Sequence, residues 1–543
     1  MLLLVLQITY GFIMGFARIG MDNLHDFIPF NTARAVHTNL LVVWLLSGFM
    51  GAAYYIIPEE AQRELVSVKL AYVQLISLAL VGVTAIVGYH FNYWEGRKFL
   101  EIPRPLDYLV VVNVLLFLGL ILITLFKGKR KTTTALVLSM GLLFAALLYI
   151  PGMLPFDSQV TDSFFRWWVV HLWVEGVWEL IMGGILSFLL IKLTGVDREV
   201  IEKWLYVIVG LTFLSGVLGT GHHYYYIGVN KIWLIVGGIF SALEPLAFLA
   251  MALFAVNMYR KGEKKHPNKL ALYWTLGAAI VSFIGAGLLG FAHTLPQTNL
   301  YTHGTLVTAM HGHLAFWGAY AMIVLAIISY SLPNMTGRKL YESTRGRMAF
   351  WFSNIGMIGM TVAFGVAGVA QVYLERKFKM EFMVVQKEIE IHFIVLILLF
   401  TSVAFNAQTG SVKGKLIDKE YNNEPLAFAN VLIKGTTKGT TSDFDGLYEI
   451  LDLDAGTYIL VYSFVGYETQ EISTTITAGE TTMLNVVMSA SAASLDEVVI
   501  TTSTKRETET ALLLEQKKAV VMKQSIGAQE LSRKGVSDAA GAV

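Results

Sequence analysis

Long apolar stretches recur along most of this chain, and they constrain its fold more than any other feature. Each of twelve such stretches reaches the length of about 17 to 25 residues that an α-helix needs to cross the hydrocarbon core of a bilayer. They lie roughly at 1–19, 36–57, 68–91, 106–126, 132–150, 165–193, 201–221, 232–258, 270–294, 303–330, 347–373 and 389–406. Only 15% of the 543 residues are charged, against about 25% in soluble proteins. We therefore predict an all-α polytopic membrane unit of twelve transmembrane helices over residues 1–406.

The loops between these stretches alternate in charge. KGKRK (127–131), YRKGEKKHPNK (259–269) and GRKLYESTRGR (337–347) are basic, whereas the loops of the other set are mixed or acidic. The positive-inside rule places the basic set, and both ends of the twelve-helix unit, in the cytoplasm. The first stretch has no basic region or cleavage site before or after it, so we interpret it as a helix rather than a cleaved signal.

Net charge and cysteine content exclude several classes of function. The formal net charge is +1, without the large positive excess typical of nucleic-acid-binding proteins, so we expect no nucleic-acid partner. The chain has no cysteine, which excludes disulfides, thiolate-held clusters and covalent attachment of haem c to this chain. The 12 histidines are then the candidate ligands for soft metals.

The pattern changes abruptly after the twelfth stretch. Between about 408 and 489, apolar and polar residues alternate between Gly, Asp and Asn turns, as in GTYILVYSFVGYETQEI. This period of two is typical of strands and predicts a small all-β sandwich domain. Residues 490–543 have no apolar core of their own, and we expect a disordered tail there.

The sixth apolar stretch contains VHLWVEGVWEL, with ionisable residues at intervals of four. His171, Glu175 and Glu179 would share one face of a helix. Each ionisable group at the centre of a bilayer costs about 2.5 kcal/mol or more, so such groups in membrane helices usually have a function. His222 and His223, in GTGHHYYYIG, lie at the outer end of the seventh helix. Three imidazoles and the Glu175 carboxylate would surround one metal, and the hard carboxylate ligand favours iron.

Three further histidines fit a second kind of metal site. His311 and His313, in HGHLAFWGAY, lie two residues apart and point to nearly opposite sides of one helix. They can therefore ligate two cofactors that flank this helix. His37, at the outer end of the second helix, is in position to supply the other axial ligand to a haem held by His313. All six candidate ligands fall in the outer half of their helices.

The ordinary interpretation of a single histidine near a helix end is an interfacial hydrogen-bonding residue. We leave five histidines with that interpretation, although His303 is also a candidate neighbour of a haem propionate. These five are His25, His90, His293, His303 and His392. His266 lies in a basic loop expected in the cytoplasm, and we interpret it as solvated. The aromatic cluster FFRWWVV (164–170) is interpreted as part of an interfacial belt.

Several segments together resemble the catalytic large subunit of respiratory nitric oxide reductase, in the haem-copper oxidase superfamily. They include PFNTARAVHTNLLVVWLLSGFMGAAYYIIPEE, WWVVHLWVEGVWELIMGG, GTGHHYYYIG, SALEPLAF, HTLPQTNLYTHGT and HGHLAFWGAY, and the resemblance covers residues 1–392. It implies two haems b, with His37 and His313 on the low-spin haem and His311 proximal to the high-spin haem. It also implies a non-haem iron held by His171, His222, His223 and Glu175, where 2 NO, 2 electrons and 2 protons give N2O and water.

The resemblance extends to buried glutamates and to one departure. Glu179 and Glu244 resemble the family's additional glutamates, with roles in proton delivery and site electrostatics, and Glu101 is expected at an outer proton entrance. Many cytochrome-dependent members have a glutamate where this chain has Lys98, and that glutamate helps to bind calcium. Because a lysine supplies its own positive charge, we expect calcium to be dispensable here.

The alternative within the superfamily is a C-family oxygen reductase, whose copper has three histidine ligands; Glu175 favours the reductase. The long N-terminal extension of the quinol-dependent type is not seen in this sequence, so we expect a haem c-bearing small subunit that receives electrons from cytochrome c or a similar donor. The resemblance places the protein in the bacterial inner (cytoplasmic) membrane, with its active site toward the periplasm.

Residues 408–489 resemble the carboxypeptidase regulatory-like domain of Bacteroidetes TonB-dependent receptors. LDEVVITTS (495–503) resembles a TonB box, and QSIGAQELSRKGVSDAAGAV (524–543) resembles a truncated plug start. FIVLILLFTSVAFNAQ (393–408) fits both a twelfth helix and the hydrophobic region of a secretory signal. Two interpretations follow: a receptor or interaction module fused to the enzyme, or a chimaeric reading frame joined near His392. We favour the second, because the twelfth helix would leave a normally periplasmic domain in the cytoplasm.

Overall fold

The computed structural model describes residues 2–19, 26–262, 266–337, 344–389, 394–405, 410–421, 423–453, 456–476 and 481–491. The chain divides into a helical unit and a β unit, with the first junction between Ser411 and Val412. The junction predicted from the sequence, between 406 and 408, lies a few residues before it. His25, His392 and almost all of the expected tail (490–543) lie outside the described residues.

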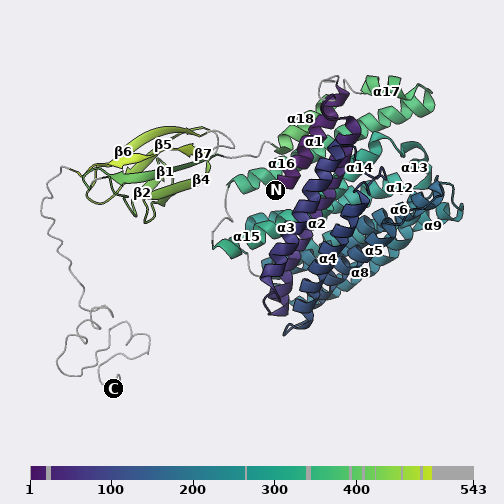
Figure 1. The fold of residues 1–543 in the computed structure, drawn as a ribbon, viewed down its shortest axis with the longest axis horizontal. Helices are drawn as coiled ribbons and strands as arrows, with labels where there is room; N and C mark the ends of the chain where they lie inside the picture. The colour runs from purple at the N-terminus through teal and green to yellow at the C-terminus, as the bar shows by residue number, and fades with distance from the viewer. Residues whose placement is uncertain are drawn as a thin grey trace, which may run out of the picture. The chain divides into compact units, whose positions relative to one another are not determined.

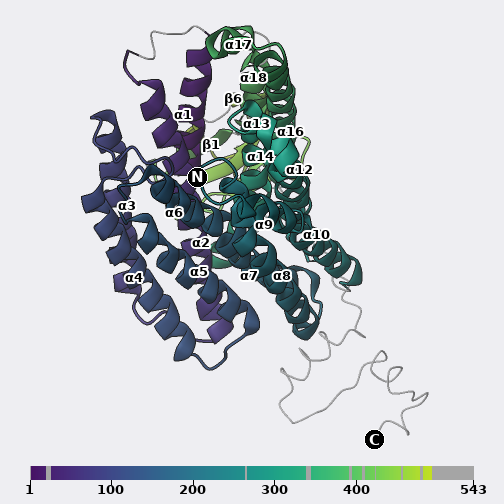
Figure 2. The same cartoon turned by 90° about the vertical axis from the view of Figure 1, so that its right-hand side faces the viewer.

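The helical unit contains long helices that run side by side (Figures 1 and 2). In its first half these are α1 (Leu2–Arg18), α2 (Phe30–Ala61), α3 (Val68–His90), α4 (Arg104–Phe126), α5 (Thr133–Gly152), α6 (Gln159–Leu172), the π-helical turn η2 (Trp173–Val177), α7 (Trp178–Thr194), α8 (Arg198–Gly219) and the 3-10 turn η3 (Thr220–His223).

The second half continues in the same manner. It contains α9 (Ile232–Ser241), α10 (Glu244–Lys261), α11 (Lys269–Ser282), the π turn η4 (Phe283–Leu288), α12 (Leu289–Thr294), α13 (Pro296–Thr302), α14 (Leu306–Phe316), the π turn η5 (Trp317–Ala321), α15 (Met322–Thr336), α16 (Thr344–Val372), the π turn η6 (Tyr373–Lys377), α17 (Phe382–Ile389) and α18 (Val395–Phe405).

Within the described residues, ten helical segments are long and apolar enough to cross a membrane. They correspond to the second to eleventh predicted stretches. The first and twelfth stretches are marked by α1 and α18, which are shorter, at 17 and 11 residues. The all-α membrane architecture is therefore confirmed, while the count of twelve spans stays a prediction.

The most enclosed span is the one that contains α6, η2 and α7. Of its most apolar window, 83% is buried inside the protein, compared with 17% for α3. A helix that is apolar all round is expected to be covered by protein on all sides. The polar residues on this span therefore face other helices, which is where a membrane protein places functional groups.

A buried ion pair joins helices at the end of the unit opposite the candidate ligands. The Arg198 guanidinium donates to both carboxylate oxygens of Glu60, at 2.6 and 2.8 Å, and the Thr132 hydroxyl donates to the same carboxylate at 2.6 Å. The Glu60 side chain is only 2% exposed. A buried carboxylate needs such a set of partners to remain charged, so this cluster fixes the ends of α2, α5 and α8 together.

The β unit is a sandwich of two four-stranded sheets, as the alternating pattern predicted. One sheet has the order β4-β1-β7, with β8 parallel to β1, and the other has the order β3-β2-β5-β6. The strands are β1 (Gly410–Asp418), β2 (Asn430–Ile433), β3 (Gly439–Thr441), β4 (Leu447–Leu453), β5 (Gly456–Ser463), β6 (Gln470–Ile476), β7 (Thr481–Met483) and β8 (Val486–Met488). Alternate side chains of these strands fill the space between the sheets.

Candidate metal centre

The sixth span is not a continuous helix at the point where its ionisable residues lie. The π turn η2 separates α6 from α7, and Glu175 within it has a non-helical backbone (φ −103°, ψ 17°). π turns inside α-helices occur frequently at functional sites. The simple interval-of-four stripe expected for His171, Glu175 and Glu179 is therefore modified, because the extra residue in the turn rotates Glu179 relative to Glu175.

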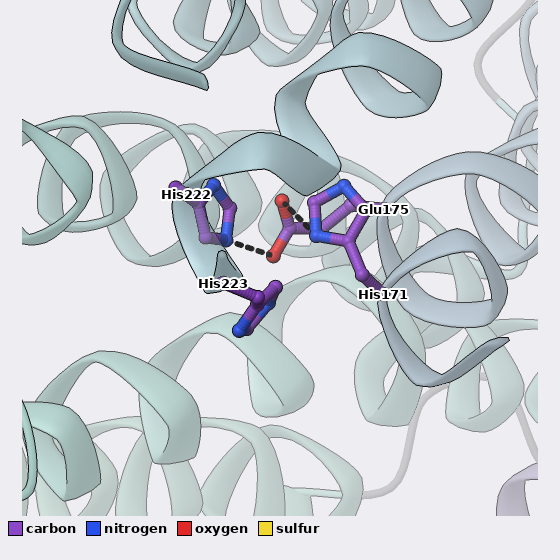
Figure 3. Close-up of side chains that lie close together, drawn as sticks. All are labelled: His171, Glu175, His222 and His223. Atoms are coloured by element: carbon purple, nitrogen blue, oxygen red, sulfur yellow. Dashed lines mark ion pairs between the residues drawn. The ribbon is translucent and has the colours of Figure 1, made fainter. Parts of the chain in front are cut away.

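Four side chains from this span and the end of α8 converge on one point. Ligand atoms of His171, Glu175, His222 and His223 all lie within 4.8 Å of one another. Figure 3 shows the Glu175 carboxylate between the imidazoles. Its oxygens are 3.4 Å from His171 Nδ1 and 4.0 Å from His222 Nε2. The four residues that the sequence predicted around one metal therefore lie close together in the structure.

Hydrogen bonds on the outer side of the cluster fix which nitrogen of each ring faces inward. His171 Nε2 lies 2.8 Å from the Gly216 carbonyl, so this nitrogen donates and Nδ1 is the free acceptor. The Ser241 hydroxyl donates to the Gly219 carbonyl at 3.3 Å and accepts from His222 Nδ1 at 2.8 Å. Such outer partners set the tautomer of ligating histidines, and here they leave His171 Nδ1 and His222 Nε2 directed at Glu175.

The third imidazole is held by stacking. The His223 ring lies parallel to the Trp167 ring, with 4.3 Å between centroids and 7° between planes. Trp167 comes from the aromatic cluster that the sequence assigned to an interfacial belt, so at least this residue also shapes the site. An adjacent pair of histidines can converge because the short 3-10 turn η3 replaces α-helix at this point.

The donor set fits a metal ion. His171 Nδ1 is buried and has no hydrogen-bond partner within the described part of the chain, as expected of a nitrogen whose partner is a cation. Three neutral imidazoles and one carboxylate suit iron among the common metals. In this arrangement Glu175 would supply the charge that compensates the cation.

The other three candidate ligands lie on α2 and α14. The ring centroids of His37 and His313 are 6.4 Å apart. Two imidazoles on opposite sides of one metal, with metal–nitrogen bonds of about 2 Å, would have ring centres roughly 6 Å apart. His37 Nδ1 lies 2.8 Å from the Gln7 carbonyl, and His313 Nδ1 lies 2.8 Å from the Ala309 carbonyl. Both rings therefore have Nε2 available for a metal.

His311 is oriented in the same way on another side of α14. Its Nδ1 lies 3.0 Å from the Gly285 carbonyl in the π turn η4. A side chain at Gly290 would come within 3.2 Å of the ring, and one at Gly11 would come within 3.1 Å of the His37 ring. Glycine at these two positions makes room for the imidazoles, which is a signal that the sequence alone did not reveal.

The three additional glutamates are all buried. Glu179 is 1% exposed and accepts a hydrogen bond of 3.0 Å from the Thr212 hydroxyl, while its other carboxylate oxygen has no partner within the described residues. Glu244, at the start of α10, is 4% exposed and interacts with Glu175. These two residues therefore lie next to the metal centre.

Glu101 lies in a different environment, in the segment between α3 and α4. It is fully buried and accepts from Arg34 at 3.2 Å and from Asn39 at 3.0 Å. Arg34 and Asn39 belong to α2, the helix that also carries His37, so Glu101 packs against this helix.

Lys98 belongs to a group of basic side chains in the same outer region. Burial, and then the guanidinium groups of Arg34 and Arg166, lower the pKa of the Lys98 amine. Burial, and then Lys98 and Arg376, also lower the pKa of His303. The Glu101 carboxylate, 3.2 Å from Arg34, lies within this group of cations and compensates part of their charge.

A small, partly open pocket lies beside the metal cluster. It is lined by Trp167, His222, His223, Tyr225, Tyr226, Ile227, Asn299 and His303. His293, which the sequence left with an ordinary role, donates to or accepts from the Thr302 and Thr308 hydroxyls at 2.9 and 3.2 Å. Its hydrogen bonds agree with that ordinary role.

Comparison with known proteins identifies the family of the helical unit. The model of the family "cytochrome c and quinol oxidase polypeptide I" matches residues 1–401, so the chain belongs to this family of membrane oxidoreductases. A cryo-EM structure of a heme-copper terminal oxidase dimer has the same fold, with a TM-score of 0.59 and 16% identity over 75% of this chain and 81% of that chain.

Within this class, the chain is similar to a nitric oxide reductase subunit of Stutzerimonas stutzeri. The two are 48% identical over 394 residues, which are 69% of this chain and 83% of that relative. Cbb3-type cytochrome c oxidase subunit CcoN1 of the same organism is 22% identical over 360 residues, 63% of this chain and 75% of that relative. The family implies haems and a metal centre in an integral membrane protein, and similarity to one subunit of a reductase implies a partner subunit and, in general, a cytochrome c donor.

The β unit has different relatives. The carboxypeptidase regulatory-like domain family matches residues 412–500. The TonB-dependent receptor SusC of Bacteroides thetaiotaomicron is 40% identical over 101 residues, which are 19% of this chain and 9% of the receptor. The chain therefore covers only a small part of such receptors, and the predicted resemblance of this segment is confirmed at the level of the domain.

Several residues that shape the site were not found from the sequence. Ser241 is an ordinary serine at the start of SALEP, and Gln7 contributes through its backbone, which carries no sequence signal. Gly216 is one of many glycines and belongs to no motif, yet a Cβ at this position would overlap the Glu175 carbonyl oxygen. Their importance follows from contacts between distant segments.

Proposed function

We propose that residues 1–406 are the catalytic subunit of a respiratory nitric oxide reductase. The reaction is 2 NO + 2 electrons + 2 protons → N2O + H2O. The single observation that carries the proposal is the Glu175 carboxylate between His171 Nδ1 and His222 Nε2, at 3.4 and 4.0 Å. A fourth, anionic donor beside three imidazoles favours non-haem iron over copper at this position.

The haem ligands follow from the same geometry. His37 and His313 would hold a low-spin haem b, and His311 would be the proximal ligand of a high-spin haem b on another side of α14. When bound, the high-spin haem and the non-haem iron supply two adjacent metals that can polarise N–O ligands and deliver electrons. The protein fixes the ring orientations through Nδ1 contacts to Gln7, Ala309 and Gly285 carbonyls.

The buried glutamates are proposed to handle protons. Glu179 and Glu244 lie beside Glu175, where a carboxyl group can pass a proton toward the reacting oxygen. Glu179 has one carboxylate oxygen without a partner in the described chain, and this oxygen is free to accept a proton. Glu101, held by Arg34 and Asn39, is placed to receive protons from the outer side.

The partners and location are proposed on the same basis. We infer a haem c-bearing small subunit that takes electrons from cytochrome c, in a bacterial inner membrane with the site toward the periplasm. The basic loops at 127–131, 259–269 and 337–347 support this orientation. We also infer that calcium is not required, because the Lys98 amine lies in the segment where related enzymes use a glutamate.

The oxygen-reducing alternative is separated from the reductase by direct assay. The purified complex, supplied anaerobically with reduced cytochrome c, should consume NO and release one N2O for every two NO. A chemiluminescence or electrode trace of NO, with N2O measured by gas chromatography, gives this ratio. Oxygen consumption without N2O formation, together with copper in place of non-haem iron, would instead establish an oxidase.

The β unit is proposed to have no part in this reaction. Either it is an interaction module fused to the enzyme, or its coding sequence joins the reductase in a chimaeric frame near residue 392, which we favour. Mass spectrometry of native membranes distinguishes the two. Peptides that span residues 380–415, from a protein near the 60.2 kDa of the full chain, would establish the fusion.

A further inference from the structure

The π turn η2 leaves one backbone carbonyl without its usual helical donor. In an uninterrupted α-helix, the Trp178 amide would donate to the Val174 carbonyl four residues earlier. Here the Trp178 amide donates to the Trp173 carbonyl instead. A carbonyl in a buried, apolar setting needs a replacement donor, because an unpaired one is costly.

A tyrosine from a distant segment supplies that donor. The Tyr320 hydroxyl donates to the Val174 carbonyl. Tyr320 is 2% exposed and itself lies in a π turn, η5, on the helix that follows His311 and His313. Its ring packs edge-on against Trp178, at 5.3 Å, and Phe49, at 6.2 Å. The ring is thus fixed, and its hydroxyl is directed at the turn that contains Glu175.

The neighbouring helix α8 contacts the same turn through a glycine. A side chain at Gly216 would overlap the Glu175 carbonyl oxygen, so only glycine allows this approach. The Gly216 carbonyl accepts a hydrogen bond from His171 Nε2 at 2.8 Å. Gly216 therefore contacts the backbone of one candidate ligand and orients the ring of another.

We propose that Tyr320 and Gly216 are positioning residues that hold η2 in its π conformation and thereby direct Glu175 at the three histidines. Neither residue touches the metal in this account; each acts through Glu175 or His171. The inference rests on the proposed function in taking the four-residue cluster as the enzyme's metal centre. It does not depend on which substrate is reduced there.

Loss of the tyrosine hydroxyl has a definite structural consequence. Without a donor for the Val174 carbonyl, the regular α-helical bond from Trp178 competes with the π turn. Conversion to a regular helix replaces the i→i−5 hydrogen bond with an i→i−4 bond. This shift by one residue rotates Glu175 by about 100° relative to α7. The carboxylate would then leave the position between His171 and His222.

The first test is Tyr320→Phe in the full complex with its partner subunit. The purified variant should keep both haems, measured by pyridine haemochrome, and lose non-haem iron to a chelator about 10- to 100-fold faster than wild type. The Mössbauer signal of the non-haem iron should also change. Tyr54→Phe is the matched control, because the Tyr54 hydroxyl donates to Gln74 at 3.2 Å, away from η2.

The second test uses two glycines of α8. Gly216→Ala should accelerate iron loss in the same way, because the new methyl group displaces the Glu175 backbone. Gly210→Ala makes the same substitution in the same helix, at a position with nothing within 4 Å of the added carbon. It should leave iron retention and the Mössbauer signal unchanged.

The proposal is overturned if Tyr320→Phe and Gly216→Ala release iron at the wild-type rate with an unchanged Mössbauer signal. It is also overturned if the two control variants lose iron equally fast. These readouts do not use NO, so they remain decisive if the wild-type complex proves unable to reduce NO. An absence of non-haem iron from the wild-type complex would refute the proposed function and this inference together, whereas iron retention insensitive to both variants would refute this inference alone.

Discussion

Replacement of Glu175 by glutamine tests whether this residue is a metal ligand or only lies near the metal. The change keeps the size of the side chain and removes its negative charge. In the structure this carboxylate is the one anionic donor among four converging side chains, with its oxygens 3.4 Å from His171 Nδ1 and 4.0 Å from His222 Nε2. The neutral amide leaves the charge of the cation uncompensated in a largely buried site.

The magnitude follows from the burial of the site. Removing one partner of a buried charge pair costs about 3–5 kcal/mol. At about 1.4 kcal/mol for each tenfold change, this is a loss of roughly two to three and a half orders of magnitude in iron affinity. We expect Glu175→Gln to lack non-haem iron and NO reduction, while the low-spin haem on His37 and His313 keeps its optical spectrum.

The assay combines iron analysis, optical spectra and anaerobic NO consumption on the purified complex. The matched control is Glu179→Gln, in the same span, whose carboxylate accepts from Thr212 rather than facing the histidines. The control should retain iron and reduce NO more slowly, because only proton transfer is impaired. Stoichiometric iron and full activity in Glu175→Gln would refute its role as a ligand.

Three further predictions concern other parts of the site. Glu101→Gln weakens the contacts to Arg34 and Asn39 and should slow NO turnover at least about 10-fold. Both haems and the iron should be retained, and stopped-flow measurement of proton uptake checks the slower step. Gly11→Leu should remove the low-spin haem spectrum because its side chain would enter the space of the His37 ring, whereas Gly82→Leu, with open space around it, should not. Elemental analysis should find less than one calcium ion per wild-type complex, and Lys98→Glu should raise this calcium content. One calcium ion per wild-type complex would contradict the proposal that the Lys98 amine makes calcium dispensable.

The sequence was sufficient to predict the membrane architecture because membrane spans are defined by length and hydropathy, which are local properties. It also brought together His171, Glu175, His222 and His223, since few other reasons place ionisable groups in a bilayer-spanning helix. Local pattern likewise identified the β sandwich from its period of two.

The details that orient the ligands were beyond the sequence because they depend on contacts between segments far apart in the chain. A regular helix would place Glu175 and Glu179 on the same face as His171, and nothing in the sequence indicates a π turn between α6 and α7. The Tyr320 hydroxyl donates to the Val174 carbonyl in that turn from 146 residues away. The Gly216 carbonyl accepts from His171, which is 45 residues away in the sequence. Trp167 was interpreted from the sequence as interfacial, because its stacking on His223 joins two segments that are distant in the sequence and leaves no local pattern.

The central claim is that the helical unit holds two haems b and one non-haem iron at the site defined by Glu175 and the three histidines. The most direct measurement is a combined optical and elemental analysis of the purified wild-type complex. Our account predicts two haems b in this chain, one with a bis-histidine low-spin spectrum, and one non-haem iron, with no copper. One copper in place of the non-haem iron would contradict it.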